Sequence, residues 1–179
     1  MIAYAITDPS TLDFSSLDTE LEKFSKKASM IVYRDKSNLN YTVNAADFVE
    51  AAKIYCFDKI IIHSDCRLAE SIGANGVHLS SSQLDNIAEA KARGLFVIVS
   101  THSLRELKKA EISGADMVTF SPVFNTPDKG KPVGLNTLKS VCFEVNIPVI
   151  ALGGILTQKH IELCRDAGAK GFASIRYFA

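Results

Sequence analysis

The chain has 179 residues, a length that suits one domain, so a single hydrophobic core over residues 1–179 is expected. Hydrophobic residues make up 47% of the chain and charged residues 22%, which excludes disordered, collagen-like and disulfide-scaffold proteins. Twenty basic and twenty acidic residues cancel, so no bulk charge favours nucleic acid or a membrane surface as a partner.

The four cysteines lie far apart and form no CxxC pair, so neither a zinc site nor a redox motif is indicated. We expect reduced, structural thiols. The first residues, MIAYAITDPS, lack the basic and long apolar regions of a signal peptide. No apolar run approaches the roughly 20 residues that a membrane helix needs. We therefore expect a cytoplasmic protein.

Short apolar runs rich in Val, Ile and Phe alternate with charged segments of helical period, a pattern typical of βα units and a parallel sheet. The predicted strands are Ile2–Ile6, Ser29–Tyr33, Lys59–His63, Gly76–Leu79, Phe96–Ser100, Met117–Phe120, Val149–Leu152 and Gly171–Ile175. The predicted helices include Leu17–Lys27, Ala45–Tyr55, Leu84–Arg93, Leu104–Ser113, Leu135–Glu144 and Gln158–Ala167. Eight strands favour a closed (β/α)8 TIM barrel. A doubly wound sheet is the alternative, although no G-x-G-x-x-G follows the first strand.

One pattern recurs in GANGVHLS, GADMVTFS and GAKGFASI, which begin at Gly73, Gly114 and Gly168. Each segment places Gly-Ala after a predicted helix and a strand directly behind it. Glycine suits the left-handed residue that ends such helices. The recurrence therefore supports repeated βα units.

The chain is short for this fold, which typically uses about 250 residues and rarely fewer than about 200. The first predicted strand begins at Ile2 and the last ends at Ile175, close to the C-terminus. We therefore predict a barrel shortened at both ends, with the outer helix after the last strand missing or reduced to a turn. Large exposed apolar patches usually mark interfaces. We expect a second copy to cover the bare flank in a homodimer or higher oligomer.

Ligand sites of parallel βα barrels form at the carboxyl ends of the strands. Arg34 and Lys36 follow the second predicted strand and lie two residues apart, so on an extended segment they point to the same side. An arginine fork beside a lysine point charge suits a diphosphate. A solvated surface pair would have the same pattern.

Histidines stand at the ends of two neighbouring predicted strands. His63 is a candidate general acid or base because the ordinary pKa of histidine lies near neutrality. His78 fits a hydrogen-bonded core residue better. After the fifth predicted strand, Thr101 or Ser103 fits the cap of the next helix, and His102 is a weaker site candidate.

The segment SPVFNTPDKGKPVGL after the sixth predicted strand is the longest and most polar loop. Loops of this length in a compact barrel are usually functional. Thr126, Lys129 and Lys131 place hydroxyl and ammonium donors there, suited to an anion. Gly153 and Gly154 follow the seventh strand, where bare backbone lets a phosphate approach closely, although a tight turn also uses glycine.

Eight segments follow one another across nearly the whole chain: AITDP, IVYRDK, IIIHSD, GANGVHLS, VSTHSLRELKKAEISGAD, FSPVFNTPDKGKPVGL, IPVIALGGI and GAKGFASI. They resemble the thiamin phosphate synthase and TenI superfamily, most specifically in VSTHS and SPVFNTP. The resemblance implies that magnesium and basic side chains draw diphosphate from an aminopyrimidine methyl diphosphate, and that the nitrogen of a thiazole phosphate captures the cation. TenI relatives instead isomerise a thiazole carboxylate phosphate or show no known catalysis.

The resemblance implies an anion-binding site that takes a phosphorylated small molecule, and its positional matches are Arg34, Lys36, Ser100, Thr126, Lys129, Gly153 and Gly154. Together with the candidates named from the residues themselves, they give the following site. The catalytic candidates are Arg34, Lys36, His63 and Lys129. The candidates for binding substrate or phosphate are Ser100, Thr126, Gly153, Gly154, Ile175 and Arg176.

The departures from the family fall on the magnesium site. His63 and Ser64 stand where the family has Asn-Asp, and Gln83 stands at the second magnesium aspartate. Asp65 and Asp85 are the doubtful substitutes, since Mg²⁺ usually takes one or two carboxylates. Mg²⁺ is therefore a cofactor of the family without an intact ligand pattern in this chain.

Three further positions also depart from the pattern. Asp128 stands where the synthase usually has threonine, and Arg176 stands where a small serine is common. Pro122 occupies the position of the histidine of the TenI tautomerase. Three functions stay open: a divergent synthase, which we favour, a binding or regulatory protein that kept the phosphate pocket, and a tautomerase that uses His63.

Overall fold

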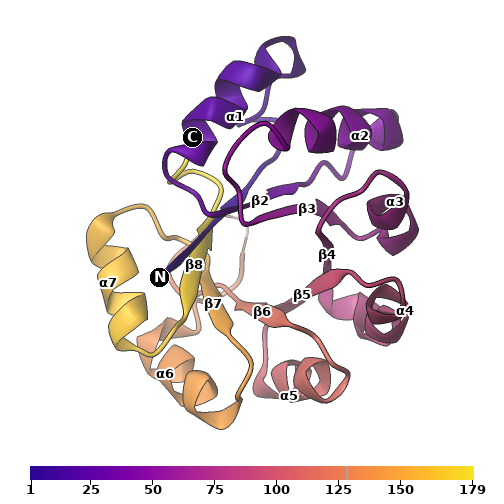
Figure 1. Cartoon of the computed structure of the whole chain (residues 1–179). Coiled ribbons are helices and arrows are strands. Elements are labelled where there is room, and N and C mark those ends of the chain that lie inside the picture. Colours follow the sequence, from indigo (N-terminus) through magenta and orange to yellow (C-terminus); the bar gives the residue numbers. More distant parts are fainter. Residues whose placement is uncertain (128) are drawn as a thin grey trace.

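The structure, a computed structural model that describes residues 1–127 and 129–179, is a closed barrel of parallel strands surrounded by helices (Figure 1). The strands are β1 (Ile2–Ile6), β2 (Met30–Tyr33), β3 (Lys59–His63), β4 (Gly76–Leu79), β5 (Phe96–Thr101), β6 (Met117–Phe120), β7 (Val149–Leu152) and β8 (Gly171–Ser174). Each strand pairs in parallel with the next, and β8 pairs with β1. The predicted TIM barrel is confirmed, and the doubly wound sheet is excluded.

The helices follow the strands in alternation, as predicted. They are α1 (Leu17–Ser25), α2 (Tyr41–Ala52), α3 (Cys66–Ser71), α4 (Ile87–Ala92), α5 (Leu104–Ile112), α6 (Gly134–Glu144) and α7 (Gln158–Asp166), with two 3₁₀ turns, η1 (Phe14–Ser16) and η2 (Ser81–Asn86). α3 was not among the predicted helices, because a helix of six residues is too short to show a period. α2 begins at Tyr41, earlier than the predicted Ala45.

Two apolar clusters fill the molecule because successive strand residues face opposite sides of the sheet. Tyr4, Met30 and Ile98 belong to the cluster inside the barrel. Ala5, Ile31 and other outward residues pack under the helices. Strands buried on both faces read as continuous apolar runs, which is why their bounds were predictable.

The recurring Gly-Ala segments do end helices. Gly73, Gly114 and Gly168 have φ values of 70°, 90° and 95°, in the left-handed region that favours glycine. The predicted helix-stop role of these three glycines is confirmed.

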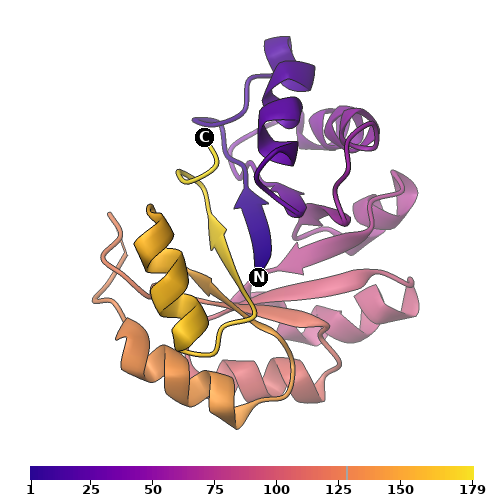
Figure 2. The same ribbon diagram turned by 60° about the vertical axis from the view of Figure 1, so that its left-hand side comes forward.

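The described residues after β8 form a turn rather than a helix, as predicted (Figure 2). The ring of Phe178 stacks on Phe172 with centroids 5.5 Å apart, and Tyr177 packs edge-on against both. Phe172 and Phe178 are only 5% and 2% exposed. The expectation of a bare apolar flank is therefore wrong here, because the C-terminal turn covers this side of the barrel itself. The prediction of an oligomer loses that support.

The C-terminal residues lie against the loop that leads from β1 to α1 (Figures 1 and 2). Phe178 and Ala179 line a groove of about 260 Å³ together with Leu12 and Phe24. The turn thus joins the last strand to the first outer helix and completes the ring of packed elements. Over the residues described, none of the helices combines the length and the apolar character that crossing a bilayer requires.

Candidate functional site

The predicted site residues gather around one opening of the barrel. Every strand pair is parallel and the sheet is closed, so all carboxyl ends lie at the same rim. The rim positions are Arg34 and Lys36 after β2, His63 at the end of β3, Ser100 on β5, Thr126 and Lys129 after β6, Gly153 and Gly154 after β7, and Ile175 and Arg176 after β8. Arg34, Lys129 and Gly153 are therefore not scattered over opposite faces.

Arg34 and Lys36 lie near enough to His63 at this rim for their charges to act on its imidazole. Burial, and then the positive charges of Arg34 and Lys36, lower the pKa of His63 to about 4. The imidazole is therefore uncharged at neutral pH, and the positive charge belongs to the arginine and the lysine. In the described part of the chain neither cation forms an ion pair. Both are available to an anionic ligand.

Tyr41 fixes the backbone of His63. The N–H of His63 donates to the hydroxyl of Tyr41 over 3.1 Å, and the ring of Tyr41 stacks on Tyr33 with centroids 5.0 Å apart. Because Tyr33 directly precedes Arg34, this stack ties the ends of β2 and β3 together. Tyr41 was not a predicted site residue, because the sequence pattern placed the start of this helix after it.

A chain of hydrogen bonds runs inside the barrel below the rim. The hydroxyl of Tyr4 lies 3.0 Å from Nδ1 of His78, and Nε2 of His78 lies 2.9 Å from Oγ of Ser100. Burial, followed by nearby His63 and Arg34, lowers the pKa of His78 to about 3. His78 is thus a neutral, hydrogen-bonded core residue, as interpreted from the sequence, and it also orients the hydroxyl of Ser100.

Thr119 lies beside Ser100 in the ladder between β5 and β6. Its Oγ1 is buried and has no hydrogen-bond partner among the described residues. Alternation along β6 directs this side chain to the interior, since Met117 belongs to the inner cluster and Val118 to the outer one. The sequence pattern did not single out Thr119, because one threonine within an apolar run carries no signal.

Gly153 and Gly154 have a packing role that the sequence did not reveal. Both adopt positive φ, 98° and 69°. A Cβ on Gly154 would lie 2.5 Å from the carbonyl oxygen of Asn125, and one on Gly153 would lie 2.7 Å from Cα of Pro122. The N–H of Phe124 donates to the carbonyl of Gly153 over 3.0 Å. The glycines therefore let the long loop after β6 lie directly on the turn after β7.

This loop brings Thr126 over the glycine turn, with Oγ1 3.3 Å from where a Cβ of Gly153 would stand. The hydroxyl of Thr126 donates to the carbonyl of Phe124 over 3.0 Å. Lys129 and Lys131 are exposed. Asp128 lies outside the described residues.

The open question at the end of β5 is settled by hydrogen bonds. Ser103 caps α5 by accepting from the N–H of Glu106, whereas the hydroxyl of Thr101 donates to the carbonyl of Thr119. His102 lies 2.9 Å from the carbonyl oxygen of Ser121 and is exposed. At β8, Ile175 packs on the inner cluster; the next residue, an arginine, is exposed.

The carboxylates suggested for magnesium do not form a metal site. Asp65 caps α3, its Oδ1 accepting from the N–H of Leu68 over 2.9 Å. Asp85 pairs with Lys109 over 2.9 Å and is 90% exposed. Among the described residues no group of three or more His, Cys, Asp or Glu side chains lies together as a candidate metal site. The donor set does not fit Mg²⁺.

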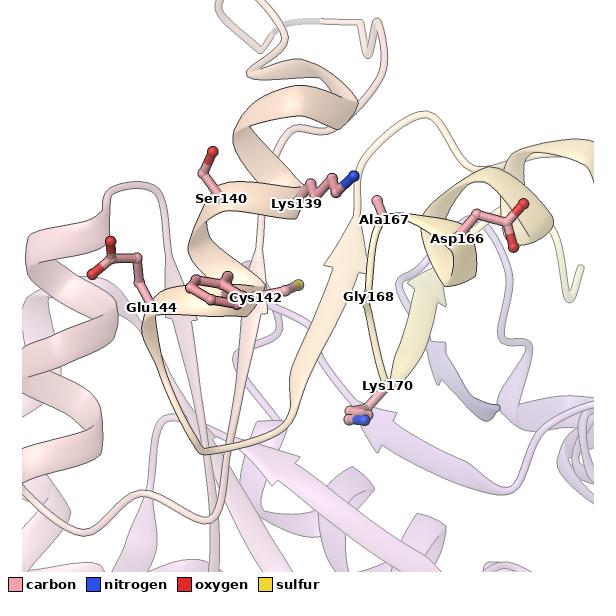
Figure 3. A pocket seen from close by; sticks show the side chains of 9 residues that line it. Lys139, Ser140, Cys142, Glu144, Asp166, Ala167, Gly168 and Lys170 are labelled. Atoms are coloured by element: carbon pink, nitrogen blue, oxygen red, sulfur yellow. The ribbon is translucent and has the colours of Figure 1, made fainter.

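A cavity of about 620 Å³ opens far from the rim (Figure 3). It lies between the C-terminal ends of α6 and α7, at the opposite end of the barrel from the polar residues. Cys142 points from α6 toward Gly168 there. Burial raises the pKa of Cys142 to about 11 and that of Cys164 to about 12, so neither thiol is activated. No catalytic arrangement is visible in this cavity.

Fold and rim place the chain in the class of parallel (β/α)8 barrels whose polar residues gather at the carboxyl ends of the strands. The family model described as thiamine monophosphate synthase matches residues 3–178. The chain belongs to this family, as the sequence resemblance predicted.

Individual proteins are similar to this chain over nearly its full length. A protein of Aquifex aeolicus (strain VF5), provisionally named thiamine-phosphate synthase 2, is 37% identical over 98% of this chain and 96% of its own. The thiamine-phosphate synthase of Syntrophomonas wolfei subsp. wolfei is 30% identical over 96% of this chain and 85% of its own. The solved structure of thiamine phosphate pyrophosphorylase from Pyrococcus furiosus superposes with a TM-score of 0.83 at 26% identity, covering 97% of this chain and 85% of that one.

Proposed function

We propose that the chain is a transferase of thiamin biosynthesis that joins an aminopyrimidine to a thiazole phosphate and releases diphosphate. The observation that carries this proposal is that Arg34 and Lys36 follow β2 at the carboxyl-end rim of the closed barrel and form no ion pair among the described residues. Its support from outside the site is the family match over residues 3–178.

In this reaction the bond between the pyrimidine methylene carbon and the diphosphate oxygen breaks, and the electron pair leaves with the diphosphate. The nitrogen lone pair of the thiazole phosphate then forms the new carbon–nitrogen bond. Negative charge builds up on the departing diphosphate. Arg34 and Lys36 stabilise it there, because charge-assisted hydrogen bonds to phosphate are about twice as strong as neutral ones.

The remaining rim residues serve the phosphate of the second substrate in this proposal. Lys129 supplies a cation from the loop after β6, and Arg176 supplies one after β8. Thr126 and Ser100 add hydroxyl groups. The hydroxyl of Thr126, which donates to a backbone carbonyl in the free protein, turns to the phosphate when the ligand binds.

The test is turnover with purified protein. With both substrates present, thiamin phosphate and diphosphate form in equal amounts. Arg34→Ala and Lys36→Ala each lower kcat/KM by about 10- to 100-fold, since a charged hydrogen bond contributes about 1.5–3 kcal/mol. Lys108→Ala is the matched control because Lys108 pairs with Glu144 on the outer helices. Absence of turnover, under conditions where a known synthase is active, would refute the synthase proposal.

A TenI-like protein without synthase activity is the second candidate. It is favoured by one observation: Asp65 and Asp85, the carboxylates nearest the family's magnesium positions, are engaged elsewhere. Such a protein binds thiazole phosphate or thiamin phosphate as a regulator, or isomerises its ligand with His63 as the base. It predicts that thiazole phosphate raises the melting temperature although no thiamin phosphate forms. An unchanged melting temperature contradicts it.

Assembly and location stay predictions. We propose a homodimer or higher oligomer in the cytoplasm, with a phosphorylated small molecule as ligand and neither nucleic acid nor membrane as partner. Analytical ultracentrifugation measures the assembly directly. A stable monomer at micromolar concentration would contradict the oligomer.

A further inference from the structure

A hydrogen bond joins the loops after β3 and β4 at the two positions where the resemblance places magnesium carboxylates. The side-chain amide of Gln83 donates from Nε2 to the carbonyl of Ser64 over 3.0 Å. Its Oε1 accepts from the N–H and from the hydroxyl of Ser80, each over 3.0 Å. Both ends of the amide are therefore engaged within the protein, and no lone pair of Oε1 is left for a cation.

Ser64, whose carbonyl accepts this hydrogen bond, is also fixed by hydrogen bonds of its own. Its φ of 70° lies in the left-handed region, which side chains other than glycine rarely adopt. Its N–H donates to the carbonyl of His78 over 2.9 Å, its carbonyl accepts from Gln83, and its Oγ lies 2.6 Å from Nδ1 of His63. All its polar groups are paired. Unfavourable backbone conformations persist where the surroundings enforce them, often at functional sites.

Serine and glutamine in place of two carboxylates and a divalent cation leave the net charge of this part of the site unchanged. Two carboxylates and one divalent cation sum to zero charge, and so do a serine and a glutamine. A diphosphate at the rim therefore meets the same net charge from this part of the site in either arrangement. The attraction comes in both cases from Arg34 and Lys36, which form no ion pairs in the described part of the chain.

We infer, resting on the proposed function, that this chain holds the diphosphate of its substrate without a divalent cation. The bond between Gln83 and Ser64 keeps the two loops together in place of a shared metal. Arg34 and Lys36 supply the positive charge. Asp65 and Asp85 stay in their structural roles at α3 and Lys109.

Inorganic diphosphate is the probe, titrated into the full chain by calorimetry in EDTA and in excess MgCl₂. The wild-type protein binds in EDTA, and Mg²⁺ strengthens binding by less than about threefold. Arg34→Ala weakens binding by about tenfold or more in both media. Because Mg²⁺ also binds diphosphate in solution, the double variant Ser64→Asp/Gln83→Asp serves as the comparison under identical conditions.

The double variant carries two added negative charges. It loses diphosphate binding in EDTA and regains it with Mg²⁺, whereas the wild type shows no such dependence. Mn²⁺ alone, followed by its electron paramagnetic resonance signal, binds the double variant and not the wild type. Wild-type binding in EDTA and the wild-type Mn²⁺ signal, neither of which involves Mg²⁺ bound to free diphosphate, decide the question even where the double variant does not fold.

The experiment separates failure of the metal-free site from failure of the proposed function. Wild-type binding that requires Mg²⁺, or Mn²⁺ bound to the wild type and released in Asp65→Asn, overturns the metal-free site and leaves the proposed function standing. Absence of diphosphate binding by the wild type in both media overturns the anion site and the proposed function together.

Discussion

Nε2 of His78 lies 2.9 Å from the hydroxyl of Ser100, so a core residue of β4 orients a rim residue of β5. The other ring nitrogen of His78 lies 3.0 Å from the hydroxyl of Tyr4 on β1. The hydrogen-bonded side chains therefore lie among the apolar side chains of the barrel interior, with Met30 beside Tyr4 and Ile98 beside His78 in the sheet. A substitution in this hydrogen-bonded series therefore affects both the rim and the stability of the barrel.

Tyr4→Phe removes the hydroxyl at one end of the hydrogen-bonded series Tyr4–His78–Ser100. It leaves Nδ1 of a buried imidazole without a partner, which costs about 1–3 kcal/mol of unfolding free energy. Urea denaturation measures this change. Tyr177→Phe is the control, because the hydroxyl of Tyr177 forms no hydrogen bond within the described residues, and it shifts stability by less than about 0.5 kcal/mol. Equal losses in the two variants would show that the bond to His78 contributes nothing.

Stability falls as the solution is acidified. The pKa of His78 is about 3 in the folded protein, because of burial first and then of His63 and Arg34, against an ordinary value of 6.5. The unfolded chain therefore takes up a proton below about pH 6.5 that the folded chain refuses until about pH 3. The stabilisation is fully present above about pH 6.5 and is lost at up to about 1.4 kcal/mol per pH unit below it.

His63 contributes with the same sign between about pH 6.5 and its folded pKa of about 4. Denaturation curves recorded from about pH 7 down to about pH 5 test both histidines. His78→Gln reduces the slope of unfolding free energy against pH, whatever its effect on stability at neutral pH. A wild-type slope of zero in this range would contradict the buried, neutral state of both rings.

Gly154→Ala disturbs the contact between the turn after β7 and the long loop after β6. The added Cβ would meet the carbonyl oxygen of Asn125 at 2.5 Å and Cβ of Phe124 at 2.8 Å, at a φ of 69°. Gly94→Ala is the matched control, since Gly94 has a φ of 73° and nothing within 4 Å of the added atom. The control costs about 1 kcal/mol from backbone conformation alone, and Gly154→Ala costs a further 1–3 kcal/mol, roughly, from the clash. Thermal or urea unfolding of the two variants gives the difference.

Phe178→Ala tests whether the turn after β8 belongs to the packed core. The ring is 2% exposed and stacks on Phe172, so its loss costs about 3 kcal/mol or more. Phe143→Ala, on a side chain that is 92% exposed, changes stability by less than about 0.5 kcal/mol. Equal stability of the two variants would show that Phe178 does not contribute to the core.

The strands were predictable because they are buried on both faces. Five of them, β1, β3, β4, β6 and β7, begin and end at the predicted residues, since glycine, aspartate or lysine borders a short apolar run in most cases. The rim placement of Arg34, His63 and Lys129 followed from the same pattern, because residues after parallel strands share one end of a barrel. Helix starts were less predictable: α3 begins where Asp65 caps it, a hydrogen bond rather than a period.

The amino-acid sequence by itself determined the eight-stranded barrel, the rim and the family, because apolar periodicity and local motifs act over short stretches of chain. Only the tertiary structure decided what the side chains at the rim are bonded to. Tyr4 meets His78, Gln83 meets Ser64, and Gly154 meets the loop after β6. Each partner comes from a different βα unit, and hydrogen bonding and close packing depend on distances that exist only once the barrel has closed.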